Sequence, residues 1–227
     1  MNPNKVVAGV LAIGVFLITS AQAQSGAISG RGRSNRTAND RATTIGVLGG
    51  LNLATLGGAD ADGFESKPGI LLGGYASFGI TKNFAIETGA LYSQRGAKFS
   101  DQGVTLKFKL DYVEVPLLLS ARFPGEGGVT PFFSGGPAFA FKASCGFSVT
   151  GSGTSVGTGC RAVEDELEIG IKSADAGLVG AAGVDVKSLR IALRYFLGLS
   201  TIDNVAPTYS IKNQVFSLVV GYGFRLR

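Results

Sequence analysis

The chain has no histidine and no tryptophan, and its 227 residues include only two cysteines and one methionine. Without histidine, the Ser–His pairs and histidine bases that many hydrolytic enzymes use cannot be assembled. Two cysteines without histidine make a poor zinc site, and the C-x-x-C spacing usual in redox catalysis is missing. These absences predict a protein that is not an enzyme and that needs no metal and no cofactor.

Long apolar runs are missing after residue 23, although the mean hydropathy of the chain, +0.28, is high. A helical membrane protein reaches such a value through runs of about 18 or more apolar residues. Here the apolar residues recur at every second position, which is the period of a β-strand. In the segment 213–227 one face is uniformly large and apolar and the other mostly small or polar. The large residues of this face are Phe216, Leu218, Val220, Tyr222 and Phe224. Such bulky groups from several strands would overfill a small barrel, so we expect them to contact lipid.

Eight segments have strand character, and their connections are alternately long and short. This rhythm is typical of outer-membrane barrels with brief periplasmic turns and longer external loops. The sequence therefore predicts an all-β fold: an eight-stranded antiparallel up-and-down transmembrane β-barrel over residues 43–227. We expect a bulge or kink at Pro116, which removes a ladder hydrogen bond. The expected strands are Thr43–Leu53, Gly69–Ile80, Phe84–Ala97, Leu106–Arg122, Thr130–Lys142, Ala174–Val186, Leu189–Ser200 and Ile211–Phe224.

The first 23 residues have the features of a secretory signal peptide. Lys5 precedes an apolar stretch, Val6–Ile18, that is short for a membrane span, and Ala21-Gln22-Ala23 offers a cleavage site. Residues 24–42 lack apolar periodicity and are expected to be a disordered periplasmic leader. Without Lys5, 20 of the chain's 21 basic residues remain against 16 acidic ones. This dispersed excess is too small for a nucleic-acid-binding surface.

Seven charged residues fall on the strand faces opposite the bulky apolar ones, where we expect them to line the lumen. An unpaired buried charge is costly, so these side chains should form ion pairs. Two interpretations stay open: a salt-bridged plug that fills the interior, or a narrow polar path whose ion pairs rearrange to pass small solutes. The seven residues are Glu87, Arg95, Glu114, Arg122, Asp175, Arg190 and Arg194.

The longest connection, residues 143–173, contains both cysteines and a run of acidic residues. In an exported protein, Cys145 and Cys160 are expected to form a disulfide that closes a local loop. The acidic residues between Glu164 and Glu168 favour an external loop that contacts another protein of the envelope or the extracellular space.

Several segments resemble the PorT-type outer-membrane β-barrel family. Leu91–Ala97, LYSQRGA, resembles the family's LYSQKGA strand end, and Leu110–Leu118, LDYVEVPLL, resembles its LDYLEIPLLL motif. Leu193–Ser200 is similar to its RYxxGLxxI strand, and Gly221–Phe224 adds a matching end. The resemblance covers about residues 43–227 and implies an outer-membrane location. Some members of the family are linked to secretion or gliding machinery. Two departures are the Arg225-Leu226-Arg227 ending and the cysteine-closed loop.

The leading hypothesis is a non-enzymatic integral outer-membrane barrel that is structural, or binds partners through its external loops, and assists secretion or envelope functions. Its expected partners are outer-membrane lipid, the barrel-assembly machinery and an envelope or extracellular protein. Eight strands can close alone, so we expect a monomer. A narrow porin-like channel and a water-soluble ligand barrel of the lipocalin kind are the alternatives.

Overall fold

In a computed structural model of the chain, the described residues are 42–57, 65–101, 103–151, 154–160, 172–201 and 212–226. The predicted signal peptide, nearly all of the predicted leader and the acidic residues at 164–168 lie outside them. None of the helices in these ranges is long and apolar enough to cross a membrane. The elements are β1 Thr43–Gly57, β2 Glu65–Gly79, β3 Phe84–Asp101, β4 Val104–Arg122, the short 3-10 helix η1 Glu126–Gly128, β5 Val129–Gly151, β6 Thr154–Gly159, β7 Ala174–Val186, β8 Leu189–Gly198 and β9 Lys212–Leu226.

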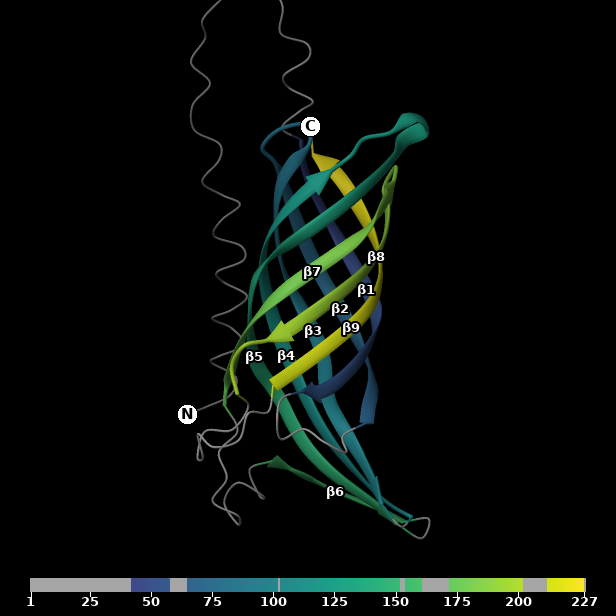
Figure 1. Ribbon diagram of the computed structural model, residues 1–227, viewed down its shortest axis with the longest axis vertical. Coiled ribbons are helices and arrows are strands. Elements are labelled where there is room, and N and C mark those ends of the chain that lie inside the picture. Colours follow the sequence, from purple (N-terminus) through teal and green to yellow (C-terminus); the bar gives the residue numbers. More distant parts are fainter. Residues whose placement is uncertain are drawn as a thin grey trace, which may run out of the picture. The chain divides into compact units, whose positions relative to one another are not determined.

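The strands form one antiparallel sheet that closes on itself (Figure 1). Their order is β4-β3-β2-β1-β9-β8-β7-β5-β6, and β4 also pairs with β5. This additional pairing joins the two sides of the sheet into a barrel. Within the described residues β6 pairs only with β5, so it lies outside the closed ring.

The expectation of eight strands is wrong by one, because the described residues form nine. Each of the eight expected segments corresponds to a strand, and the ninth, β6, lies in the connection expected to be a loop. The sequence of β6, TSVGTG, has one large apolar residue, and all six of its residues are exposed. Its conformation comes from pairing with β5 rather than from an alternating pattern of its own.

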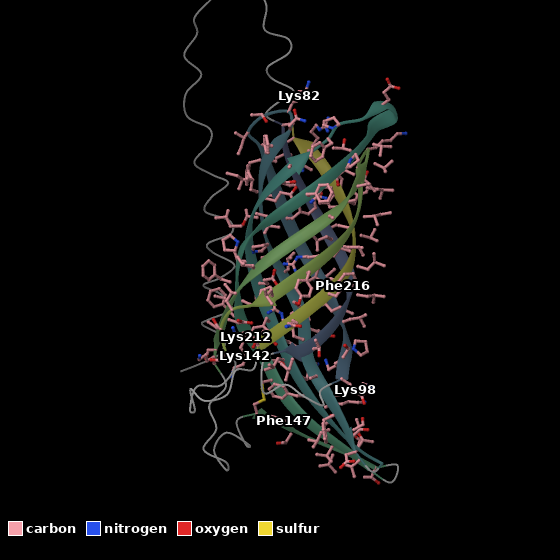
Figure 2. The ribbon with its side chains drawn as sticks, in the orientation of Figure 1. Lys82, Lys98, Lys142, Phe147, Lys212 and Phe216 are labelled. Atoms are coloured by element: carbon pink, nitrogen blue, oxygen red, sulfur yellow. A yellow bond between two sulfur atoms is a disulfide. The ribbon has the colours of Figure 1, made fainter. Side chains whose placement is uncertain are left out.

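The outer wall of the ring is apolar and its interior is closely filled. Leu51 is 66% exposed and Phe133 61%, whereas their inward neighbours Asn52 and Phe132 are nearly inaccessible. On β9 the five bulky residues from Phe216 to Phe224 point outward, as the alternation predicted, and Ser217 and Val219 are buried. Figure 2 shows Phe216 projecting from the wall.

The expected bulge at Pro116 is not found, although neither Val115 nor Pro116 pairs with β3, and the β3–β4 register is the same on both sides of this gap. Pro116 pairs with Ala138 without a change of register, and the shift between β4 and β5 lies instead at Asp111 and Tyr112. Asp111 pairs with Ser144 and Tyr112 with Lys142, which leaves Ala143 of β5 as the extra residue. The bulge therefore lies where β5 leaves β7, whose last pairing with β5 is Ala174 with Phe141.

The two ends of the barrel differ. At one end, which we call the turn end, short connections join β2 to β3 and β7 to β8, and η1 lies between β4 and β5. At the other end β3, β4 and β5 continue past the ring and carry β6 (Figure 1). This extension comprises residues 99–101, 104–110, 145–151 and 154–159. It begins beyond the last pairings of β3 with β2 and of β5 with β7.

Two adjacent glycines of β2 provide a test of this packing. A Cβ at Gly73 would lie 2.1 Å from the carbonyl oxygen of Ala90, whereas at Gly74 its nearest contact would be 3.7 Å away, at the Gly46 oxygen. We expect Gly73→Ala to destabilise the barrel by about 1–3 kcal/mol, because backbone atoms must shift. The matched Gly74→Ala change should shift stability by less than about 0.5 kcal/mol. Urea midpoints, followed by the gel mobility of the folded species, measure both. Equal urea midpoints for the two variants would contradict the close approach of the Ala90 carbonyl oxygen to Gly73.

Candidate functional site

All seven charged residues expected in the lumen take part in ion pairs, and they divide into two clusters. Six of the seven side chains are buried, and that of Arg122 is 20% exposed. Each cluster draws its members from several strands, since the closed sheet turns one face of every strand toward the axis. The clusters lie at different levels of the interior.

The first cluster is centred on Glu114 of β4, whose carboxylate accepts from two arginines. Arg95 of β3 and Arg194 of β8 each donate to a different oxygen of this group. Arg95 also lies 3.4 Å from Asp175 of β7, and Asn213 of β9 donates to the same aspartate oxygen at 2.9 Å. Five strands are thereby linked around one carboxylate, and we call these five residues the Glu114 cluster.

The second cluster is centred on Glu87 of β3. Arg190 of β8 donates to both oxygens of this carboxylate at 3.0 Å and to Asp185 of β7 at 2.8 Å. Arg122 of β4 donates to Glu87 at 3.0 Å and to Ser77 of β2 at 2.9 Å. We call these five residues the Glu87 cluster.

One acid that makes the charges balance was not expected from the sequence. Three acids and four bases were expected on inward positions, but Asp185 belongs to the Glu87 cluster as well. Each cluster therefore contains two carboxylates and two guanidinium groups. A neutral cluster is much less costly to enclose than one with an unpaired charge. Asp185 lies next to the turn between β7 and β8. The alternation of the strand ends there, so its pattern did not show that Asp185 points inward.

Aromatic rings, also missed, cover both central arginines. The Arg95 guanidinium lies 3.8 Å from the ring centroid of Phe196 and 4.9 Å from that of Tyr112. The Arg190 guanidinium is likewise placed near Phe132 and Tyr75. Such contacts favour a cation over the face of an aromatic ring. Phe132 and Phe196 could have been noticed as bulky residues on positions of the inward period.

Little space remains between the clusters. A cavity of about 60 Å³ is lined by residues that include Glu87, Phe132 and Arg194. Buried apolar side chains such as Leu71, Leu91 and Val219 fill the neighbouring layer. Passage of a solute would require the arginine–carboxylate pairs to separate. Among the described residues, no group of three or more cysteine, histidine or acidic side chains could hold a metal ion.

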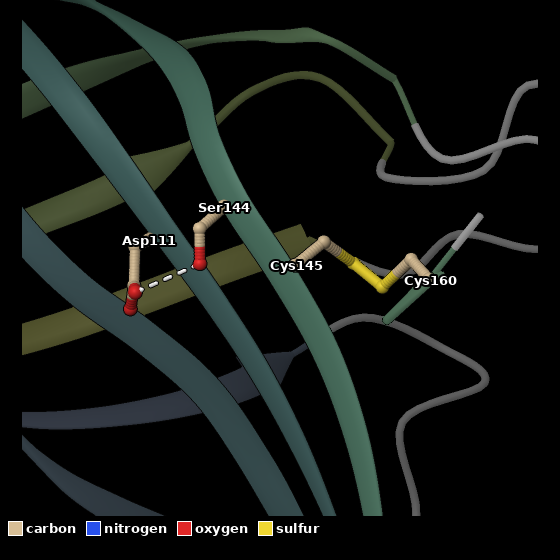
Figure 3. The surroundings of a disulfide bond; sticks show 4 residues. All are labelled: Asp111, Ser144, Cys145 and Cys160. Atoms are coloured by element: carbon tan, nitrogen blue, oxygen red, sulfur yellow. Dashed lines mark hydrogen bonds between the residues drawn. A yellow bond between two sulfur atoms is a disulfide. The ribbon is translucent and has the colours of Figure 1, made fainter. Parts of the chain in front are cut away.

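A disulfide holds β6 on β5 within the extension, and Asp111 forms hydrogen bonds where the extension meets the ring. Cys145 on β5 is bonded to Cys160, next to the end of β6, with Cα atoms 5.4 Å apart (Figure 3). Asp111 accepts from Ser144 at 3.1 Å and from Tyr92 at 2.8 Å, beside the bulge. In the chain-entropy model, a disulfide that closes a loop of this length adds about 3 kcal/mol to the free energy of unfolding, because it restricts the unfolded chain. Beyond this point, β5 is bonded on one side to β4 and on the other to β6.

Four apolar side chains form a row across the extension, one from each of its strands. Each is paired with the next across adjacent strands: Phe99 with Leu106, Leu106 with Val149, and Val149 with Val156. Paired residues share one face of a sheet, so the four lie side by side. They are 40–69% exposed. Leu106 of this row and the buried Leu110 lie four residues apart on β4, so they share one face of the sheet. The row therefore continues the interior surface of the ring. We call these four residues the apolar row.

Removal of one carboxylate tests the role of the Glu114 cluster. Glu114→Gln keeps the side-chain shape but leaves Arg95 and Arg194 without a charged partner there. We expect a loss of about 3–5 kcal/mol in the free energy of unfolding, because both charges stay buried. The control is Glu65→Gln, which breaks the exposed pair with Lys98 at 2.7 Å and should cost less than about 1 kcal/mol. Urea unfolding in detergent measures both, and equal costs would show that the buried cluster has no special role.

Comparisons with known proteins identify one matching family model and several similar solved structures. The family model described as "Outer membrane protein beta-barrel domain" matches residues 21–204. Similar solved structures include Ail of Yersinia pestis, at 14% identity and a TM-score of 0.40, with 80% of this chain and 98% of that chain covered. Neisserial surface protein A has 13% identity and a TM-score of 0.44, with 79% and 97% covered. OprG of Pseudomonas aeruginosa has 13% identity and a TM-score of 0.42, with 82% and 98% covered. Among curated proteins, no sequence match is found. Since the family model spans most of the sequence, the chain belongs to the family of proteins with an outer membrane protein beta-barrel domain.

Proposed function

We propose that this protein is a non-enzymatic integral outer-membrane barrel with a closed interior, whose extension binds a segment of another envelope or extracellular protein. In this proposal the eight strands of the ring cross the membrane and β6 does not. The short turns face the periplasm, the extension faces outward, and the resemblance to the PorT-type family favours a role in secretion or in the envelope. The observation that carries the proposal is the exposed apolar row.

The apolar row is positioned to bind an extended chain. Exposed apolar side chains that adjoin one another on a sheet mark interaction surfaces more often than scattered ones do. The edge of β6 that faces away from β5 has no strand partner in the described part of the chain. An open edge can accept a further strand through its backbone, while pockets between side chains select alternate residues of that strand. The partner that fits is an extended polypeptide segment with apolar residues at every second position.

The disulfide supports this role by holding the edge in place. Cys145 and Cys160 fix β6 on β5 next to the Gly146–Gly159 pair, where β6 ends. The rings of Phe108 and Phe147, 4.6 Å apart, pack between the row and the ring. A preformed edge lowers the entropy lost when a partner binds.

Charge placed in the apolar row should abolish partner binding. Val149→Asp combined with Val156→Asp puts two carboxylates on the row. Ser148→Asp combined with Ser155→Asp adds the same charge to the opposite face of the same strands. We expect the valine pair to reduce recovery of the bound protein from envelope fractions by about tenfold or more, because unpaired charges would be buried. Deletion of residues 143–173 should have the same effect. Quantitative mass spectrometry of pull-downs measures this, and equal recovery with both double variants would contradict the proposal.

A narrow channel is the second candidate, favoured by the polar character of the interior. Between the two clusters, the cavity lined by Glu87 and Arg194 has a volume of about 60 Å³, which is small for a solute path. We therefore expect planar-bilayer recordings of the purified protein to show no conductance above the lipid background. Discrete conductance steps in the unaltered protein that change with Glu87→Gln would favour the channel instead.

A further inference from the structure

A recess opens at the turn end, and its walls carry mostly positive charge. Its volume is about 620 Å³, within the range of small-molecule sites. We call it the vestibule. Among the described charged residues that line it, five are cations and one is an anion. The cations are Lys82, Arg122, Lys187, Arg190 and Arg225, and the anion is Asp185.

The inner end of the vestibule is formed by the Glu87 cluster. The Arg190 guanidinium donates four hydrogen bonds to Glu87 and Asp185, so these nitrogens already have acceptors within the cluster. In Arg122, by contrast, one terminal nitrogen donates both of the hydrogen bonds that the side chain makes to the cluster, to Glu87 and Ser77. Its Nε is buried and has no hydrogen-bond partner among the described residues. The side chain of Arg122 as a whole is 20% exposed and lines the recess, so its guanidinium can contact an anion there.

The remaining three cations lie nearer the mouth. Lys82 belongs to the β2–β3 turn, Lys187 to the β7–β8 turn, and Arg225 follows Gly221 and Gly223 on the inward period of β9. None of the three forms an ion pair with another residue of the described ranges, whereas Lys98 and Lys109 at the extension end do. Figure 2 shows Lys82 at one end of the barrel and Lys98 toward the other. The side chains of Thr44, Thr81 and Ser188 add hydroxyl groups to the wall.

From this arrangement we propose that the vestibule binds a small multivalent oxyanion of the phosphate class. Several cations around one recess with walls of low dielectric raise the local concentration of anions. A partly exposed guanidinium such as that of Arg122 suits phosphate oxygens, and lysines and hydroxyls complete such a site. More than one negative charge is needed to balance three cations outside the neutral cluster. The phosphate group can belong to a soluble anion or to a lipid headgroup.

The test uses inorganic pyrophosphate as the probe and the full barrel in phosphatidylcholine nanodiscs. The vestibule variant combines Lys82→Gln, Lys187→Asn and Arg225→Gln; asparagine is chosen because φ is 57° at residue 187. The control combines Lys98→Gln, Lys107→Gln and Lys109→Gln, which removes the same charge from the extension end. Arg122→Gln is a separate variant. Heat-modifiable gel mobility shows that each variant is folded.

Isothermal titration calorimetry should show one saturable site per barrel, weakened by added salt. We expect the vestibule variant to bind about tenfold or more weakly, Arg122→Gln to weaken binding as well, and the control variant to stay within about twofold of the unaltered protein. Absence of saturable binding, or equal losses in the vestibule and control variants, would overturn the proposal. In nanodiscs that contain phosphatidic acid, whose phosphomonoester headgroup can carry two negative charges, competition with pyrophosphate assigns the site to a lipid headgroup, and unchanged affinity assigns it to a soluble anion.

Discussion

The fold depends on the neutralisation of charges inside a closed sheet. A ring whose outer wall is apolar must turn the opposite face of every strand inward, and that face here carries eight charged groups in the two clusters. Each guanidinium lies against a carboxylate, and the central pair in each cluster is further covered by aromatic rings. Replacement of Glu114, for example, would leave the buried Arg194 without a counter-ion. Three of these ion pairs join strands that are not neighbours in the sheet, and they therefore brace the ring across its interior: Arg95–Asp175, Arg190–Glu87 and Arg194–Glu114.

The sequence was sufficient to predict the features that a period of two produces. The outward residues of β9, the inward position of Glu114 and the cysteine pair were all accessible from alternation or from spacing, because a strand displays its side chains to opposite sides in turn. Asp185 was missed because it adjoins a turn, where the period ends. Phe132 and Phe196 were missed because a bulky apolar residue on an inward position carries no sign of the arginine that it covers.

Other features depend on neighbours distant in sequence. β6 has no alternating pattern of large residues and is a strand only because β5 extends beside it. Pro116 suggested an irregularity, yet the register shift lies at Asp111 and Tyr112, where β5 parts from β7. The apolar row likewise requires the register of four strands, since its members are spread from Phe99 to Val156. The vestibule combines three turns and the end of β9, which no local pattern brings together.

The long sequence separation of the ion pairs constrains how the barrel can assemble. Glu87 and Arg190 are 103 residues apart, and Glu114 and Arg194 are 80 apart. A chain that entered hydrocarbon one hairpin at a time would carry β3 and β4 into it before the arginines of β8 arrived. Contacts between such remote residues form late, because the loops that separate them must first close. The bracing contacts of the finished ring are therefore unavailable to its early intermediates. Hydration of these side chains has to last until the carboxyl-terminal strands have joined.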